Sequence, residues 1–403
     1  MILKETLAEV SITQHEKLLG TSPGIIREKL NTLEITPGFA LVISGIRRCG
    51  KSTLLRQMVG NQKKFNYLNF EDMRIFGFEV SDFPKLNEIF YSKPENIIYF
   101  FDELQNVKDW ERYIRVLTDK RKKVVITGSN ASMLSRELGT KLTGRHLHYE
   151  LFPFSYNEYL ILKNKKAALS TLEEYILKGG FPEFLKSGNE LILQELFNDI
   201  ITRDIIVRHG LRNDKIVKDL ALYLLSNIGK EFTYNSLKKI YNLGSVNTII
   251  SLMGYFEDSY LLFTIPQFDY SYKKQLVNPK KVYAIDTGLI NKNTVSFSQD
   301  KGRLLENLVF LQLKRHGDEV YYFRQKKECD FIVRDNNKKM SAIQVCYKLT
   351  EENKEREMAG LIEALEYLDI DNGLILTVAQ EDELEYKNKK IKVLPSWQWL
   401  TNY

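Results

Sequence analysis

The segment of residues 39–55 constrains the fold of this chain more than any other. An apolar run at residues 39–44 leads directly into GIRRCGKS, which matches the pattern GxxxxGK[ST], and an apolar stretch typical of a helix follows. In that pattern the glycines let backbone N–H groups close around phosphate oxygens, and the following helix directs its positive end at them. The sequence therefore predicts a phosphate-binding loop between a buried strand and a helix.

The fixed positions of this loop have expected roles. Lys51 should reach the outer phosphates of a nucleoside triphosphate, and Ser52 should give its hydroxyl to Mg²⁺, which prefers oxygen ligands. Arg47 and Arg48 are either phosphate ligands or contacts to another domain. We therefore predict a site for ATP and Mg²⁺, whose nucleotide-binding residues are Gly45, Arg48, Gly50, Lys51, Ser52 and Thr53.

A second apolar run, residues 96–101, ends in Asp102 and Glu103. Its composition suits the centre of a parallel sheet, and acids at that sheet end lie near the phosphates. An aspartate there can hold Mg²⁺ through a water, and a neighbouring carboxylate can act as general base for the attacking water. We expect Asp102 to serve the metal and Glu103 to serve hydrolysis, although Asp-Glu alone would also fit an ordinary turn.

Three further strands are expected at residues 65–70, 124–128 and 147–151. An extra strand between the glycine loop and the Asp-Glu strand, with a glutamate beside the metal carboxylate, resembles the additional-strand glutamate division of P-loop ATPases. That division contains the AAA+ and STAND-type proteins. The resemblance implies that Asn130, or its neighbour Ser129, senses the γ-phosphate; the alternative is a strand-ending turn.

Arg145 stands just before the last of these strands, where AAA-like proteins often carry a charge-stabilising arginine. An arginine helps there because negative charge accumulates on the phosphoryl oxygens in the transition state. The alternative is a structural salt bridge, and the sequence does not distinguish action in cis from action in trans.

Six segments in order resemble the prokaryotic AAA-family ATPases that carry a C-terminal nuclease-fold domain: GIRRCGKSTLL, FFDELQN, TGSNASML, LTGR, PFSYNEY and GGFPEFL. The resemblance covers nearly the whole chain. It implies an α/β fold whose four domains are a parallel P-loop ATPase core (1–155), a helical lid over the nucleotide (156–210), a winged helix (211–290) and a restriction-endonuclease-like α/β domain (291–403).

Residues 215–285 combine helical stretches with two strand-like runs and resemble a winged helix. Such a fold can lay its second helix, capped by Ser245, in the major groove. Ser245, Asn247 and Thr248 could then meet base edges, with Lys273 and Lys274, from the basic segment 270–274, on the backbone. That helix is short of Arg and Lys, which weakens sequence-specific reading. The alternative is a winged helix that contacts only the ATPase core.

The C-terminal third resembles the PD-(D/E)xK nuclease fold, which needs an aspartate, then an acid and a lysine two residues apart. Asp330 supplies the aspartate, but the acid position is Gln344 and the lysine position is Cys346. Lys348 is expected on the same strand face, so a migrated lysine with Glu306 as the acid could restore an active site. A degenerate fold that binds DNA or protein is favoured over an active nuclease.

The composition fits a soluble globular protein, with 43% apolar and 27% charged residues and no apolar run near the ~18 residues that cross a bilayer. No secretory signal is evident, and the three scattered cysteines are expected to be reduced thiols, so a cytoplasmic location without membrane attachment is expected. The net charge of +6 allows a polyanion partner without requiring one.

Three functions remain open from the sequence. The first is an ATP-hydrolysing AAA-type molecular switch or motor that acts on or with DNA. The second is an ATP-gated, metal-dependent DNA nuclease. The third is a signalling ATPase whose C-terminal domains bind protein partners, and in each case the chain could form a homo-oligomer.

Overall fold

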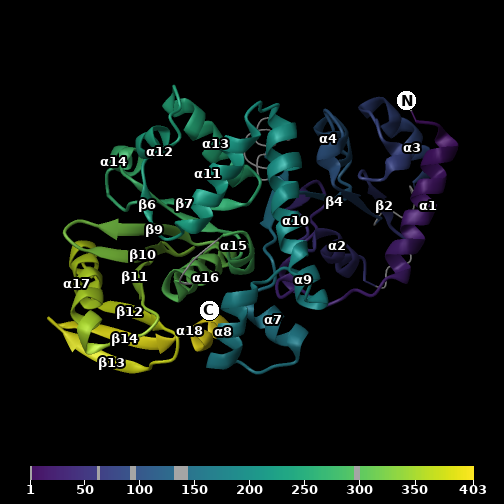
Figure 1. Cartoon of the computed structure of the whole chain (residues 1–403). Coiled ribbons are helices and arrows are strands. Elements are labelled where there is room, and N and C mark those ends of the chain that lie inside the picture. Colours follow the sequence, from purple (N-terminus) through teal and green to yellow (C-terminus); the bar gives the residue numbers. More distant parts are fainter. Residues whose placement is uncertain (1, 61–63, 91–96, 131–143, 295–299) are drawn as a thin grey trace. The chain divides into compact units, whose positions relative to one another are not determined.

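The computed structural model describes residues 2–60, 64–90, 97–130, 144–294 and 300–403 (Figure 1). The chain divides into two compact units, Met1–Leu151 and Phe152–Tyr403. The segments TGSNASML and LTGR lie partly outside the described residues.

The first unit is built on a five-stranded parallel sheet with the order β2-β3-β4-β1-β5. Its strands are β1 (Ala40–Ser44), β2 (Asn66–Asn69), β3 (Ile98–Asp102), β4 (Lys123–Gly128) and β5 (His146–Glu150). Strand β4 lies between β1 and β3, so the predicted extra strand is confirmed. A parallel sheet of this order with helices around it matches the P-loop NTPase fold.

Helices surround this sheet and fill its core with aromatic residues. They are α1 (Lys4–Gly20), α2 (Lys51–Val59), α3 (Phe83–Ile89) and α4 (Glu111–Asp119). Every residue of β1 and β3 is buried, as expected for central strands covered on both faces. Phe83 stacks on Tyr113 with ring centroids 3.8 Å apart, which fixes α3 against α4.

The second unit begins with helices. They are α7 (Tyr156–Lys163), α8 (Leu169–Lys178), α9 (Pro182–Ser187), α10 (Leu191–Asp199) and a π-helix (Ile200–Val207). The turn after α8 is held by Asp286, which accepts a hydrogen bond of 2.6 Å from Gly180 N and caps α15 (Thr287–Asn293). We predicted that these helices form a lid over the nucleotide. That role depends on how the two units are placed relative to each other, so it stays a prediction.

A small antiparallel sheet, order β6-β8-β7, follows within the second unit. Its elements are α11 (Asp214–Ser226), β6 (Glu231–Phe232), α12 (Tyr234–Ile240), α13 (Val246–Asp258), β7 (Leu262–Pro266), α14 (Tyr272–Val277) and β8 (Lys280–Ala284). Ser245 caps α13 as predicted. The basic segment predicted as the wing, residues 270–274, leads into the short helix α14, which begins at Tyr272.

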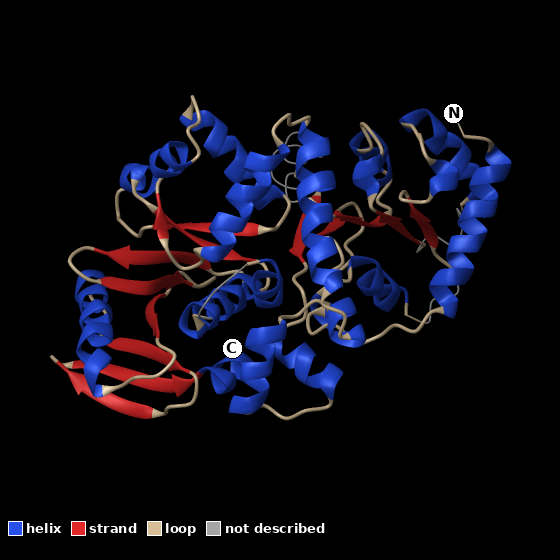
Figure 2. Cartoon of the chain, in the orientation of Figure 1, coloured by secondary structure: helices blue, strands red, loops and turns tan. Residues whose placement is uncertain are grey.

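The C-terminal part is a mixed six-stranded sheet, order β13-β14-β12-β11-β10-β9 (Figure 2). The strands are β9 (Glu319–Arg324), β10 (Glu328–Arg334), β11 (Met340–Val345), β12 (Asn372–Thr377), β13 (Asp382–Tyr386) and β14 (Lys389–Pro395). The helices are α16 (Lys301–His316), α17 (Glu351–Leu368) and α18 (Ser396–Asn402).

Helix α17 packs closely on this sheet through an apolar core that includes Leu361, Leu365 and Ile375. A Cβ at Gly360 would lie 1.8 Å from Glu328 O, so only glycine allows this approach of helix and strand. Strand β11 ends at Val345, which contradicts the prediction that Lys348 shares a strand face with Gln344 and Cys346.

Candidate functional site

The phosphate loop leaves β1 at Ser44 and enters α2 at Lys51, as the sequence predicts. Gly45 lies so close to the chain after β5 that a Cβ would stand 2.1 Å from Leu151 O. Gly50 precedes α2 with a φ of 105°, a backbone conformation that residues with a Cβ rarely adopt. Close packing therefore requires glycine at position 45, and the backbone conformation favours glycine at position 50.

Lys51 turns its ammonium group inward, and its residue is only 4% exposed. Its Nζ lies 3.1 Å from Gly45 O, 3.3 Å from Ile46 O and 3.3 Å from Glu103 Oε1. Burial lowers the pKa of Lys51, but Glu103 and other anionic neighbours outweigh it and raise the pKa above its usual value. Lys51 therefore stays charged while it contacts the carboxylate assigned to hydrolysis.

Asp102 ends β3 and is fully buried. It accepts hydrogen bonds from the hydroxyls of Thr127 and Tyr67, the latter at 3.1 Å, and from the hydroxyl of Ser52. Burial and the neighbouring Glu103 raise the pKa of Asp102. Adjacent oxygens from Ser52 and Asp102 are ligands that Mg²⁺ prefers, so these side chains fit the predicted metal site.

Glu103 follows β3 in a left-handed backbone conformation, φ 53° and ψ 44°. Its backbone N–H donates to Thr127 Oγ1 at 3.0 Å, and its carboxylate accepts from Gln105. Burial raises the pKa of Glu103, but Lys51 and the Gln105 hydrogen bond outweigh it, so the pKa lies below its usual value. A non-glycine residue in this conformation is uncommon and is typical of functional sites.

Strand β4 brings polar groups between the phosphate loop and the acids. Thr127 bridges Asp102 and Glu103, and Ser129 Oγ accepts a 3.3 Å hydrogen bond from Gln105. Asn130 is buried just beyond the end of β4, at the edge where we expected it. Sequence reasoning missed the parts played by Thr127 and Gln105; a lone threonine within the apolar run of β4 was the available signal.

Arg145 lies elsewhere in this unit. It precedes β5, and its carbonyl accepts from Ala40 N at the start of β1, whereas the phosphate loop follows the end of β1. Its guanidinium forms a salt bridge with Asp119. Arg145 lies at the amino ends of the parallel strands, whereas the predicted catalytic group lies at their carboxyl ends. The structure therefore does not bring Arg145 to that group within this unit. Arg48 has a φ of 63° within the loop, and Arg47 pairs with Glu71 at 3.3 Å.

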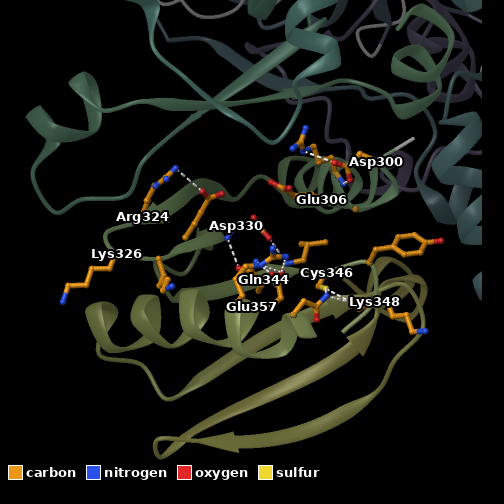
Figure 3. Close-up of a pocket in the computed structure, with 17 residues that line it drawn as sticks. Asp300, Glu306, Arg324, Lys326, Asp330, Gln344, Cys346, Lys348 and Glu357 are labelled. Atoms are coloured by element: carbon orange, nitrogen blue, oxygen red, sulfur yellow. Dashed lines mark hydrogen bonds and ion pairs between the residues drawn. The ribbon is translucent and has the colours of Figure 1, made fainter. Parts of the chain in front are cut away.

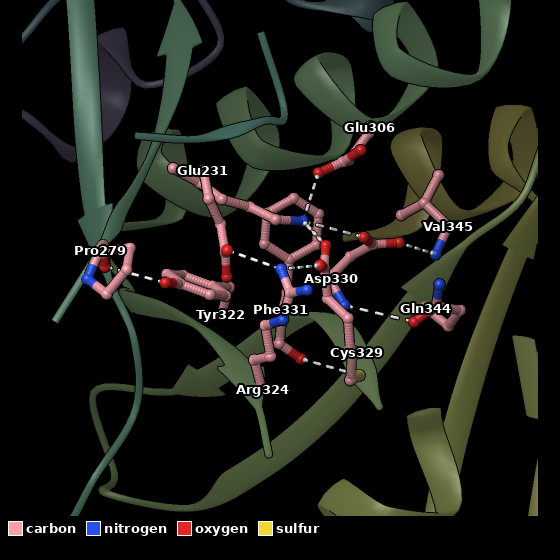
Figure 4. Close-up of polar contacts among 12 residues, drawn as sticks. Glu231, Pro279, Glu306, Tyr322, Arg324, Cys329, Asp330, Phe331, Gln344 and Val345 are labelled. Carbon is pink, nitrogen blue, oxygen red and sulfur yellow. Dashed lines mark hydrogen bonds and ion pairs between the residues drawn. The ribbon is translucent and has the colours of Figure 1, made fainter. Parts of the chain in front are cut away.

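The second unit holds a buried charge centre that the sequence only partly revealed. Lys281 of β8 is 1% exposed, and its Nζ lies 2.7 Å from Glu328, 3.1 Å from Asp330 and 3.2 Å from Glu306. Figure 4 shows that Glu306 and Asp330, two of these acids, come from different elements. Tyr283 donates a further hydrogen bond of 2.6 Å to Glu306.

The predicted nuclease residues do gather around this centre. Gln344 accepts from Asp330 N at 3.2 Å and donates to Glu357 at 2.7 Å. Cys346 donates from its thiol to Lys348 O at 3.1 Å. All five predicted residues line one cavity of about 640 Å³ (Figure 3). Sequence reasoning missed Lys281, because β8 lies outside the nuclease-like segment.

This centre does not fit a divalent metal. The ammonium of Lys281 already occupies the space that the three carboxylates share, and no group of three or more His, Cys, Asp or Glu in the described ranges has the arrangement of a metal site. Burial and, to a smaller extent, the nearby Asp330 raise the pKa of Glu306 to about 7. A carboxyl group that tends to keep its proton is a poorer metal ligand.

None of the helices in the described part of the chain combines the length and apolar character that spanning a bilayer requires.

Comparison with known protein families supports the ATPase fold of the first unit. A family model described as "AAA domain" matches residues 38–160. Two others, both described as "Domain of unknown function", match residues 169–300 and 301–399.

Solved structures give only distant matches. A STAND protein with a tetratricopeptide repeat sensor from Pyrococcus horikoshii is 17% identical with a TM-score of 0.30, over 72% of this chain and 45% of that one. The Aeropyrum pernix ORC1 protein, solved in complex with DNA, is 11% identical with a TM-score of 0.27, over 72% and 90%. At these TM-scores neither match says more about the chain.

Two relatives are similar over most of their length. An uncharacterized protein of Methanocaldococcus jannaschii is 36% identical over 438 residues, covering 100% of this chain and 97% of the relative. An uncharacterized protein of Haemophilus influenzae is 31% identical over 341 residues, covering 79% and 85%. With an AAA domain on a P-loop sheet and relatives of this extent, the chain belongs to the family of AAA-type ATPases that these uncharacterized proteins represent.

Proposed function

We propose that the chain binds Mg²⁺–ATP at the loop of residues 45–53, hydrolyses it, and works as a molecular switch that acts on or with DNA. The observation that carries the ATPase part is the buried contact between Lys51 and Glu103 at 3.3 Å, beside Asp102 and Ser52. It joins the cation for the phosphates and the base for water in one cluster.

The chemistry follows from these contacts. Without phosphates, Lys51 is satisfied by loop carbonyls and by Glu103. A triphosphate offers Lys51 stronger anionic partners, so the ammonium moves toward it and leaves Glu103 free to accept a proton from the attacking water. Gln105 donates to the carboxylate of Glu103, and we expect Asn130, which is buried beyond the end of β4, to orient the water. Ser52 and Asp102 would hold Mg²⁺, which would neutralise charge on the phosphates.

Two substitutions test this division of roles. Lys51→Ala should abolish tight binding of a fluorescent ATP analogue, because the ammonium expected at the outer phosphates is lost. Glu103→Gln should keep binding and stop phosphate release, because an amide cannot take the proton. Lys123→Ala, at the opposite end of β4, is the control and should change neither. Equal loss of binding in Lys51→Ala and Glu103→Gln would refute the assignment.

The DNA part of the proposal draws on the second unit. We propose that the elements from α11 to β8 form a winged helix, and that the sheet β9–β14 with α16 and α17 is a degenerate restriction-endonuclease-like domain; the mixed helix and strand order of both parts supports this. We propose four domains with the boundaries predicted above, helices 156–210 forming the lid over the nucleotide. A DNA titration at two salt concentrations tests this part, because phosphate contacts weaken as salt rises.

Two alternatives are separated by the same experiments. Absence of DNA binding at low salt, with and without ATP, would favour a signalling ATPase with protein partners. An ATP-gated nuclease would cut plasmid with Mg²⁺ or Mn²⁺ and lose that activity in Asp330→Ala. The buried Lys281 speaks against it, since its ammonium stands among the acids that would have to hold the metal.

A further inference from the structure

The cavity of about 640 Å³ in the second unit has an uneven balance of charges (Figure 3). Each carboxylate that lines it already has a cationic partner within 3.3 Å. Lys281 pairs with three of them, Arg303 Nε lies 3.2 Å from Asp300, and Arg356 lies 2.6 Å from Glu357. Every acid thus has a cationic partner, but a single ammonium serves three of them, so the floor of the cavity keeps a net negative charge. The lining as a whole has six cationic side chains against five carboxylates.

Three lysines at the same cavity have no such partner. Lys326, Lys327 and Lys348 line it, are exposed, and form no ion pair with any residue in the described part of the chain. Figure 3 shows Lys326 and Lys348 at opposite rims, with the buried carboxylates between them. Their charges remain available, so an anion is attracted to the rim of the cavity and not to the acids on its floor.

The segment between β7 and β8, the other candidate for contacts with phosphate, is exposed but partly held by contacts within the second unit. Phe268 N donates to Tyr322 O at 2.7 Å, Tyr322 donates to Pro279 O at 2.8 Å, and Lys274 pairs with Asp269 at 3.1 Å. This segment is thus fastened to β9, which leaves the cavity rim as the better supported basic surface.

We infer that this cavity binds the phosphodiester backbone of a single DNA strand without a divalent metal, through Lys326, Lys327 and Lys348. A volume of about 640 Å³ is in the range of small-ligand pockets and is too small to admit a duplex. Sequence-independent single-strand binding relies on positive charge along the backbone. The inference rests on the proposed action on DNA and identifies the surface that carries it.

The test is fluorescence anisotropy of the full chain with a fluorescein-labelled single-stranded oligonucleotide, in EDTA and without nucleotide. Wild type should bind equally in EDTA and in Mg²⁺. The triple variant Lys326→Ala/Lys327→Ala/Lys348→Ala should bind about tenfold or more weakly at low salt. Its slope of log affinity against log salt should fall by about 2, since each single-strand contact contributes about 0.7.

Controls make the result specific. Lys166→Ala/Lys186→Ala/Lys387→Ala removes the same charge from exposed positions of the second unit that do not line the cavity, and it should bind as wild type does. Equal losses in both triple variants, no binding in EDTA, or equal competition by a blunt duplex would overturn the inference. Because ATP is absent, a failure here is independent of the Lys51 and Glu103 experiments.

Discussion

Replacing Lys281 by methionine should destabilise the second unit strongly. The substitution keeps most of the side-chain length but removes the ammonium that lies among Glu306, Glu328 and Asp330. Removing one member of a buried ion pair costs ~3–5 kcal/mol, because the remaining charge is left buried and uncompensated. Two of these acids, Glu306 and Asp330, are buried. We therefore expect the free energy of unfolding to fall by ~3–5 kcal/mol at pH 7.

Urea unfolding measures this loss. With a urea m-value of about 3 kcal/mol/M, a destabilisation of that size lowers the midpoint by ~1–2 M. Trp110 is in the first unit, so a Trp110→Phe background leaves Trp397 and Trp399 of α18 as fluorescent reporters of the second. Lys280→Met in that background should shift the midpoint far less.

The Lys280 control shares the strand and the chemistry of the substitution, but it forms no ion pair with any described residue. Equal shifts in Lys281→Met and Lys280→Met would refute the reasoning, because the loss would then belong to the strand and not to the charge centre. Adding Glu306→Gln and Asp330→Asn to Lys281→Met should recover part of the stability, since fewer buried charges remain unpaired.

Three further outcomes are expected. Burial raises the pKa of Glu306 to about 7, so between pH 4.5 and 7 the folded unit retains a proton that the unfolded chain releases. The urea midpoint of the second unit should therefore fall as pH rises from about 4.5 to 7, and Glu306→Gln should flatten that dependence. Gly45→Ala should abolish binding of the ATP analogue, because its Cβ would meet Leu151 O at 2.1 Å; unchanged binding would contradict this packing. Thr127→Val should lower the rate of phosphate release about tenfold or more with little change in ATP affinity, because the hydroxyl that positions Asp102 is lost; unchanged turnover would count against it.

The sequence predicted the first unit well because its signals are local. A buried strand, a glycine-bounded loop and a helix are adjacent in the chain, so GIRRCGKST fixed both the element order and the positions of Lys51 and Ser52. The side chains that complete the site come from strands that meet only after folding, and neither Thr127 nor Gln105 stood out by itself. Arg145 precedes β5, so in a parallel sheet it lies at the amino ends of the strands, away from the phosphate loop. The salt bridge given as the alternative is present, and catalytic action in trans stays a prediction.

In the second unit, residue spacing identified the cavity but not its chemistry. Gln344 and Cys346 in place of an acid and a lysine indicated a degenerate site, and the structure brings them to the cavity with Asp330. The deciding residue, Lys281, precedes Asp330 by 49 positions and belongs to a different sheet. No periodicity or motif connects them, because a buried ion pair depends on long-range packing. The end of β11 at Val345 was likewise not visible in the alternation of residues.

The position of Lys281 also bears on how the chain can be divided. Family models place a boundary at residue 300, and this lysine lies before it while all three of its carboxylates lie after it. A fragment ending there would lack the carboxylates that pair with this lysine, and the complementary fragment would lack the cation among its acids. The two regions of unknown function therefore form a single folding unit. Neither evolution nor protein engineering could separate them without breaking this charge centre.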